Sequence, residues 1–121
     1  FIQNLKIIFK DTIVINFSDA QLIIDNNTLN FAGYITFDFI DINNFYRHYQ
    51  VNRKHRKDIK KIRFGYLFNF DEKYIEIDNL KVDGNTNQNL NNFLNKINSK
   101  KEDIFNKIVF RNTIKNFFKN F

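Results

Sequence analysis

The chain has 121 residues, which is enough for one domain with a hydrophobic core. It contains no cysteine, which excludes a disulfide framework and a thiolate metal site, and no apolar run approaches the roughly 20 residues that cross a bilayer as a helix. The net charge of +6 favours anionic partners such as nucleic acid or acidic lipid head groups. A general bias towards Asn, Ile, Lys and Phe, which make up more than half of the residues, explains the same charge equally well. Because the chain begins at Phe1 and ends inside an amphipathic pattern, we expect it to be a piece of a longer protein.

Three short apolar or alternating runs open the chain. They span residues 5–9, 12–17 and 21–25, and the polar pairs Lys10-Asp11 and Ser18-Asp19 separate them. Asn26-Asn27 follows the third run and favours a turn, because Asn tolerates positive φ angles. Together with the strand described next, these runs predict four short antiparallel strands joined by tight turns.

The strongest strand signal lies at residues 29–39, where apolar and polar residues alternate with a period of two. In a strand, this spacing places the two sets of side chains on opposite faces. The apolar set is Leu29, Phe31, Ile35, Phe37 and Phe39, with Gly33 in the same row. We therefore expect a long strand with one apolar face and one solvated face.

The period changes after Asp41, whose side chain can accept a backbone N–H and begin a helix. Apolar residues from Ile42 to Tyr49 recur at i, i+3, i+4 and i+7, which predicts a short helix at about residues 41–50. The densest basic run of the chain follows, and it is typical of a loop or a solvated linker. The basic residues of this run are Arg53, Lys54, Arg56, Lys57, Lys60 and Lys61.

A two-residue alternation returns at residue 62 and predicts a hairpin. The residues that share the apolar face of its first strand are Ile62, Phe64, Tyr66, Phe68 and Phe70. Asp71-Glu72 forms the predicted turn. The apolar residues after Asn79 are out of phase with those before it, so we predict a β-bulge at Asp78-Asn79. Asp83-Gly84 ends the second strand, because this dipeptide is a strong turn signal.

Residues 85–121 predict two helices. Apolar residues from Leu90 to Ile97 have the i, i+3, i+4, i+7 spacing of the first helix, and Ser99 with Glu102 matches a capping box for the second. The apolar residues of the last helix divide into two sets, Ile104, Phe105, Ile108 and Val109 on one side and Phe110, Ile114, Phe117, Phe118 and Phe121 roughly opposite. Such a helix either breaks near Arg111 or is covered on two sides.

These elements predict an α+β fold, with an antiparallel meander or curved sheet, one short mid-chain helix and two C-terminal helices. Residues 1–84 would form the sheet with its inserted helix. Residues 85–121 would form a helical segment that packs on the sheet or caps it.

No constellation of catalytic or metal-binding residues stands out. His48 and His55 have no acidic or imidazole partner at ligand spacing, so solvated histidines are favoured over a metal site. A turn and a helix cap explain Asp38 and Asp41 better than acid–base catalysis does. The glycines are isolated and the two serines lie at break or cap positions, which indicates neither a phosphate-binding loop nor a nucleophilic triad. We predict a non-catalytic protein with no cofactor and no metal.

Two kinds of binding remain, beside the plain alternative that the apolar rows form an ordinary core. In the first, the basic run from Arg47 to Arg63, interleaved with Tyr46, Tyr49 and His55, binds nucleic acid through phosphate contacts and base stacking. In the second, the apolar faces of the strands form an open trough for acyl chains.

From Gly33 onward, the order of strand, helix, strand, hairpin and helix resembles the C-terminal region of AsmA-like proteins from AT-rich α-proteobacteria. The resemblance covers about residues 31–121. It rests on the segments 33–39, 41–51, 61–70, 75–84 and 90–94, and within them on the neighbourhoods of Phe45-Tyr46 and Val82-Asp83-Gly84.

The resemblance implies a function in the bacterial envelope. AsmA-like proteins are anchored in the inner membrane by an N-terminal helix, and their long curved sheet is thought to carry phospholipids through the periplasm towards the outer membrane. We therefore expect lipid transport or outer-membrane assembly on the periplasmic side of the inner membrane, with membrane association through parts outside these residues. The residues implied to line the apolar groove are Phe31, Ile35, Phe37, Phe39, Phe64, Tyr66 and Phe68. The basic run from Arg53 to Lys61 would contact anionic head groups, or a polyanion if the chain is instead a basic nucleic-acid-binding module.

Overall fold

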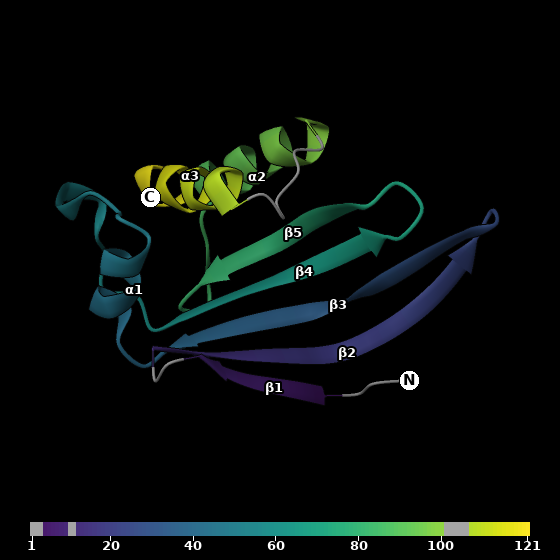
Figure 1. Ribbon diagram of the computed structural model, residues 1–121, viewed down its shortest axis with the longest axis horizontal. Helices are drawn as coiled ribbons and strands as arrows, with labels where there is room; N and C mark the ends of the chain where they lie inside the picture. The colour runs from purple at the N-terminus through teal and green to yellow at the C-terminus, as the bar shows by residue number, and fades with distance from the viewer. Residues whose placement is uncertain (1–3, 10–11, 101–106) are drawn as a thin grey trace.

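Six antiparallel strands form one open sheet in chain order in the computed structural model, which describes residues 4–9, 12–100 and 107–121 (Figure 1). The strands are β1 (Asn4–Phe9), β2 (Ile13–Asp25), β3 (Thr28–Phe39), β4 (Lys61–Asn69), β5 (Tyr74–Val82) and β6 (Asn85–Thr86). The helices are α1 (Ile42–His48), the 3-10 helix η1 (Arg53–His55), α2 (Gln88–Lys100) and α3 (Lys107–Lys119). The predicted α+β meander with one mid-chain helix and two C-terminal helices is therefore confirmed.

The second strand is longer than the sequence analysis predicts. The runs 12–17 and 21–25, which we expected to form separate strands, lie in the single strand β2 and pair with β3. Asp19 has a φ of 54°, and the register shifts between Ser18 and Gln21, so this polar stretch forms a bulge inside the strand. The prediction of a break at Ser18-Asp19 is wrong, because a bulge interrupts the alternation of side chains without ending the pairing.

The hairpin of β4 and β5 has the predicted features. Its turn lies between Asn69 and Tyr74. The register shifts where Arg63 and Gly65 face Lys81 and Asp78, and Asn79 has a φ of 51°. The predicted bulge at Asp78-Asn79 is therefore confirmed, and it brings the apolar residues on both sides of Asn79 to one face.

The helices α2 and α3 lie along the β5 side of the sheet, and α1 lies at the end opposite the two hairpin turns (Figure 1). Leu90 and Leu94 of α2 and Phe118 of α3 are at most 4% exposed and belong to the same buried cluster as the centre of the sheet. The sheet thus receives a second layer over only part of its apolar face.

The last helix runs unbroken past Arg111. Ile108 is 70% exposed, whereas Phe118 on the other set is 2% exposed, so the described residues cover α3 on one side. The predicted capping box falls partly outside the described residues, because Glu102 is not among them and Ser99 lies within α2. Ile104 and Phe105 of the predicted apolar set also lie outside the described residues.

Gly33 faces the bulge of β2 at close range. A Cβ atom at this position would lie 3.0 Å from the carbonyl oxygen of Ser18, 3.0 Å from the hydroxyl of Tyr66 and 3.2 Å from the Cα of Ala20. Two of these three atoms belong to the backbone and cannot rotate away. At Gly65, in contrast, the added Cβ would meet the carboxylate of Asp78, an exposed side chain that can turn aside.

We predict that Gly33→Ala lowers the free energy of unfolding by about 1–3 kcal/mol, because the added methyl group forces the backbone of the bulge apart. Gly65→Ala should cost clearly less. Chemical denaturation of the two variants measures both values, and an equal or reversed order would contradict the packing described at the bulge.

Candidate functional site

The apolar face of the sheet is divided between the core and two open regions. Ile35, Phe64 and Tyr66, three of the residues expected in the groove, are 9%, 7% and 6% exposed and lie in the core. The other four, Phe31, Phe37, Phe39 and Phe68, are half-buried. The groove residues therefore do not form one continuous open row, and the open parts of the face lie on either side of the covered centre.

The first open region is a pocket of about 370 Å³ between α1, α3 and the paired strands β2 and β3, which we call the α1–α3 pocket. Its volume falls within the range of about 300–1,000 Å³ typical of ligand sites. Its apolar lining is Ile13, Ile15, Phe37, Phe45, Tyr49, Phe110 and Ile114, and its polar lining is Thr12, Asn44 and His48.

Hydrogen bonds fix α1 as one wall of this pocket. The N–H groups of Ile40 and Asp41 both donate to the carbonyl of Thr12, at 2.9 and 3.1 Å, which ties the end of β3 to the start of β2. Asp41 caps α1 as predicted by accepting from the N–H of Asn44 at 3.2 Å. The amide of Asn44 donates to the hydroxyl of Thr12 at 3.1 Å, so the helix is attached to the strand at two points.

Aromatic contacts connect the pocket to its surroundings. The ring centroids of Phe45 and Phe39 are 5.2 Å apart, and those of Tyr49 on α1 and Phe110 on α3 are 5.8 Å apart. Burial raises the pKa of Tyr49. Its hydroxyl, like that of any tyrosine at neutral pH, is protonated and can donate a hydrogen bond. The pocket is therefore mainly apolar, with a few hydrogen-bonding groups among its lining residues.

The second open region lies at the hairpin end of the sheet, and we call it the distal patch. It consists of Leu22, Ile24, Leu29 and Phe70, which are 63%, 79%, 37% and 42% exposed. The strand register pairs Ile24 with Leu29, and the N–H of Phe70 donates to the carbonyl of Leu29, so these side chains share one face. The helices do not extend over this end of the sheet (Figure 1).

A polar network on the two hairpins holds the distal patch in place. Asn30 and Asn69 are a directly opposed, buried pair, and the amide of Asn69 donates to Asn30 at 3.1 Å. The carbonyl oxygen of the Asn69 side chain accepts from the N–H of Glu72 at 2.8 Å, and Asp71 accepts from the N–H of Leu29 at 3.2 Å. These bonds tie the turn of one hairpin to the strands of the other.

The basic segment is held mainly by Tyr46, which is 1% exposed. Its hydroxyl donates to the carbonyl of Lys57 at 2.5 Å and accepts from the N–H of the same residue at 3.0 Å. Arg56 donates to the carbonyl of Val51 at 3.0 Å. Tyr46 is thus a structural anchor, and its ring is not available to stack on a base.

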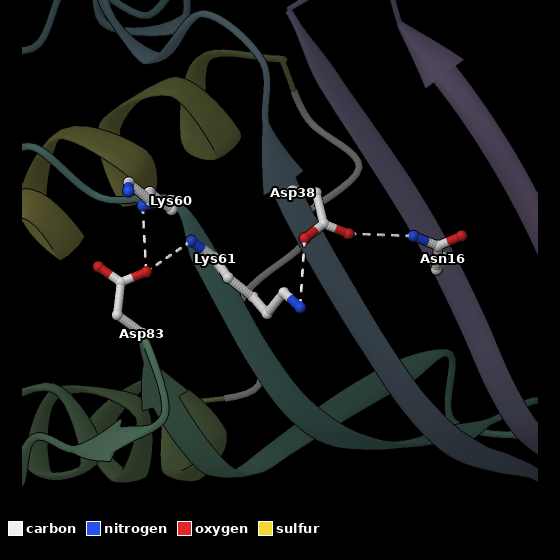
Figure 2. Close-up of polar contacts among 5 residues, drawn as sticks. All are labelled: Asn16, Asp38, Lys60, Lys61 and Asp83. Atoms are coloured by element: carbon white, nitrogen blue, oxygen red, sulfur yellow. Dashed lines mark hydrogen bonds and ion pairs between the residues drawn. The ribbon is translucent and has the colours of Figure 1, made fainter.

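Two of the predicted anion contacts also have intramolecular partners. Lys61 forms an ion pair with Asp38 at 3.6 Å, and Asp38 also accepts from Asn16 at 3.2 Å (Figure 2). Arg56 makes the bond to Val51 described above. Arg53, Lys54, Lys57 and Lys60 have exposed side chains, and Asp83 binds the backbone N–H groups of Lys60 and Lys61 (Figure 2).

His55 lies among positive charges. Partial desolvation lowers its pKa, and repulsion from Lys54, Lys119 and Lys57 lowers it further. Because Lys119 is the last residue of α3, its effect on His55 indicates that the end of this helix lies near the basic segment. Among the described residues, no group of three or more histidines and carboxylates is placed to hold a metal ion.

The α1–α3 pocket was not predicted from the sequence. Its walls come from three segments that are far apart in the chain, and no local spacing connects them. The sequence contained only an indirect signal. The two-residue alternation that includes Ile13, Ile15 and Phe37 predicts the apolar faces of the strands, and these faces form one side of the pocket.

Comparisons with protein-family models, curated proteins and solved structures find none that matches this chain. In the part of the chain that the structure describes, no helix combines the length and the hydropathy needed to cross a membrane.

We predict that Tyr46→Phe lowers the free energy of unfolding by about 1–3 kcal/mol, because the N–H and carbonyl of Lys57 lose a partner in part-buried hydrogen bonds. Tyr49→Phe is the matched control, since the hydroxyl of this half-buried tyrosine makes no hydrogen bond to any residue that the structure describes, and it should have little effect. Urea unfolding of the two variants makes the comparison. Equal losses would show that the Tyr46 hydroxyl does not anchor the basic segment.

The same hydroxyl should make stability depend on alkaline pH. Burial raises the pKa of Tyr46 from 10.0 to about 12. Because the folded state holds this proton more tightly than the unfolded state, the contribution is complete below pH 10 and is lost as the pH rises towards 12. The stability difference between the wild-type chain and Tyr46→Phe should therefore shrink over this interval. A difference that stays constant from pH 9 to pH 12 would contradict the assignment.

Proposed function

We propose that this chain binds the acyl chains of phospholipids on the apolar face of its sheet, as a non-catalytic segment of an AsmA-like envelope protein that handles lipid on the periplasmic side of the inner membrane. The observation that carries the proposal is the apolar face itself, which continues beyond the covering helices. Its ends expose large aliphatic and aromatic side chains in a row instead of singly. Contiguous exposed apolar surface of this kind is typical of interaction sites.

An acyl chain suits this surface because it needs contact area and no specific chemistry. Burying one aliphatic side chain of this size contributes about 1.5–3 kcal/mol. Ile24 and Leu22 have most of their surface still to bury, and the half-buried Phe31 and Phe68 lie beside them in the strand register. Several such contacts together give binding without any polar recognition.

The apolar surface also extends sideways from the α1–α3 pocket. Ile7 of β1 pairs with Ile15, which lines the pocket, and Leu5 pairs with Phe17. Ile7 and Leu5 are 42% and 47% exposed. The pocket therefore adjoins an apolar strip along β1, which supports contact with a chain longer than the pocket.

The basic segment supports the nucleic-acid alternative less well. Tyr46 is buried, Arg56 is bound to a backbone carbonyl, and Lys61 is paired with Asp38. The remaining exposed basic residues provide charge, but the buried ring of Tyr46 provides no surface on which a nucleobase could stack. In the lipid proposal these basic residues contact anionic head groups.

Charged substitutions in the distal patch test the proposal. Ile24→Asp should weaken binding of the chain to vesicles of phosphatidylethanolamine and phosphatidylglycerol by about tenfold, because a contact worth about 1.5 kcal/mol or more is lost. Ile8→Asp is the matched control, since Ile8 is 59% exposed but lies on the opposite face of the sheet. Vesicle flotation and mass spectrometry of copurified lipid measure the effect.

Three results would overturn the proposal. The first is an equal loss of vesicle binding in both variants, and the second is no binding by the wild-type chain. The third is salt-sensitive binding to DNA or RNA that survives Ile24→Asp and disappears when Arg53, Lys54, Lys57 and Lys60 are neutralised.

A further inference from the structure

The size of the α1–α3 pocket limits what it can hold. Its volume is about 370 Å³. A water molecule occupies about 30 Å³ of liquid, and a methylene group is of similar size, so the pocket accommodates roughly a dozen carbon atoms. That is one alkyl chain of moderate length. Two chains on one glycerol backbone would exceed it.

The chemistry at the pocket's polar side favours a negative head group. Asn44, which lines the pocket, accepts from the guanidinium of Arg47 at 3.5 Å, so this exposed cation lies next to the lining. His48 is itself part of the lining. Asp41 is also nearby, but its carboxylate is engaged with the N–H of Asn44 at the start of α1.

The helix on the other side of the pocket brings no opposing charge. The segment Lys107–Lys119 contains no acidic residue. Arg111 and Lys115 directly follow the lining residues Phe110 and Ile114 but are not part of the lining themselves. The positive charge that the hydrogen bonds place beside the lining is therefore that of Arg47 on α1.

We propose that the α1–α3 pocket binds the single alkyl chain of an anionic amphiphile, of the class of a fatty acid with a chain of moderate length, with the acid group beside Arg47 and His48. This inference rests on the proposed function, because it assumes that the apolar face receives acyl chains. It goes further in assigning the pocket to a single-chain ligand and the distal patch to diacyl lipid.

Calorimetric titration of the whole chain with dodecanoate and with dodecanol separates head-group from chain recognition. Dodecanoate should bind with one site per chain and more tightly than dodecanol. Arg47→Gln should lower the affinity for dodecanoate by about twofold to fivefold, as expected for an exposed charge contact, and leave the affinity for dodecanol unchanged. Lys81→Gln is the matched control, since Lys81 is exposed, does not line the pocket and lies outside the basic segment, and it should change the affinity for neither ligand.

A second variant tests the position of the alkyl chain. Phe110→Ser removes a wall that is 39% exposed, so the substitution spares the buried core. It should lower the affinities for dodecanoate and for dodecanol equally, and it should leave vesicle binding through the distal patch intact.

The outcomes distinguish this inference from the proposed function. Vesicle binding that depends on Ile24, without saturable dodecanoate binding, would overturn the single-chain assignment and leave the lipid proposal standing. Dodecanoate binding that is insensitive to both Phe110→Ser and Arg47→Gln would also overturn it, because the ligand would then lie elsewhere. Absence of both vesicle and dodecanoate binding would remove the proposed function together with the inference.

Discussion

The alternation of apolar and polar side chains along β2, β3 and β4 creates a sheet face that must be covered, and the helices of this chain cover only part of it. A sheet with one apolar face is stable when a second layer packs on that face. Here the second layer consists of α2 and the end of α3, which bury the centre of the sheet around Phe64 and Tyr66. Both ends of the face remain open, although they have the same side-chain pattern as the centre.

The open ends differ in shape, and the difference follows from local structure. At one end, Asp41 and Asn44 hold α1 beside β2 and β3, and the gap between α1 and α3 becomes a pocket. At the other end, the Asn30–Asn69 pair joins two hairpins, and none of the described helices lies above them (Figure 1). A pocket suits one chain with a defined head group, whereas an uncovered patch suits the less specific surface of a bilayer or of a diacyl lipid.

Much of this architecture follows from local sequence, and the rest depends on contacts between distant segments. The two-residue period predicted the faces of β3 and β4, Asp41 predicted the start of α1, and the change of phase at Asn79 predicted the bulge in β5. The bulge in β2 was not predicted, because Ser18-Asp19 looks the same in a turn and in a bulge. The anchoring of Lys57 by Tyr46 was not predicted either, since helical spacing marks Tyr46 only as apolar. Which phenylalanines lie under α2 and α3, and which border open surface, is decided by the placement of the helices on the sheet and leaves no periodic signal.

Methyl NMR of the isoleucines in the presence of a spin-labelled fatty acid tests most directly whether the apolar face receives acyl chains. The chain places isoleucines on both faces of the sheet, so it contains its own control. The account predicts that the methyl signals of Ile15, Ile24 and Ile114 broaden, while those of Ile8 and Ile23 on the opposite face remain sharp. Equal broadening on both faces, or none at all, would contradict it.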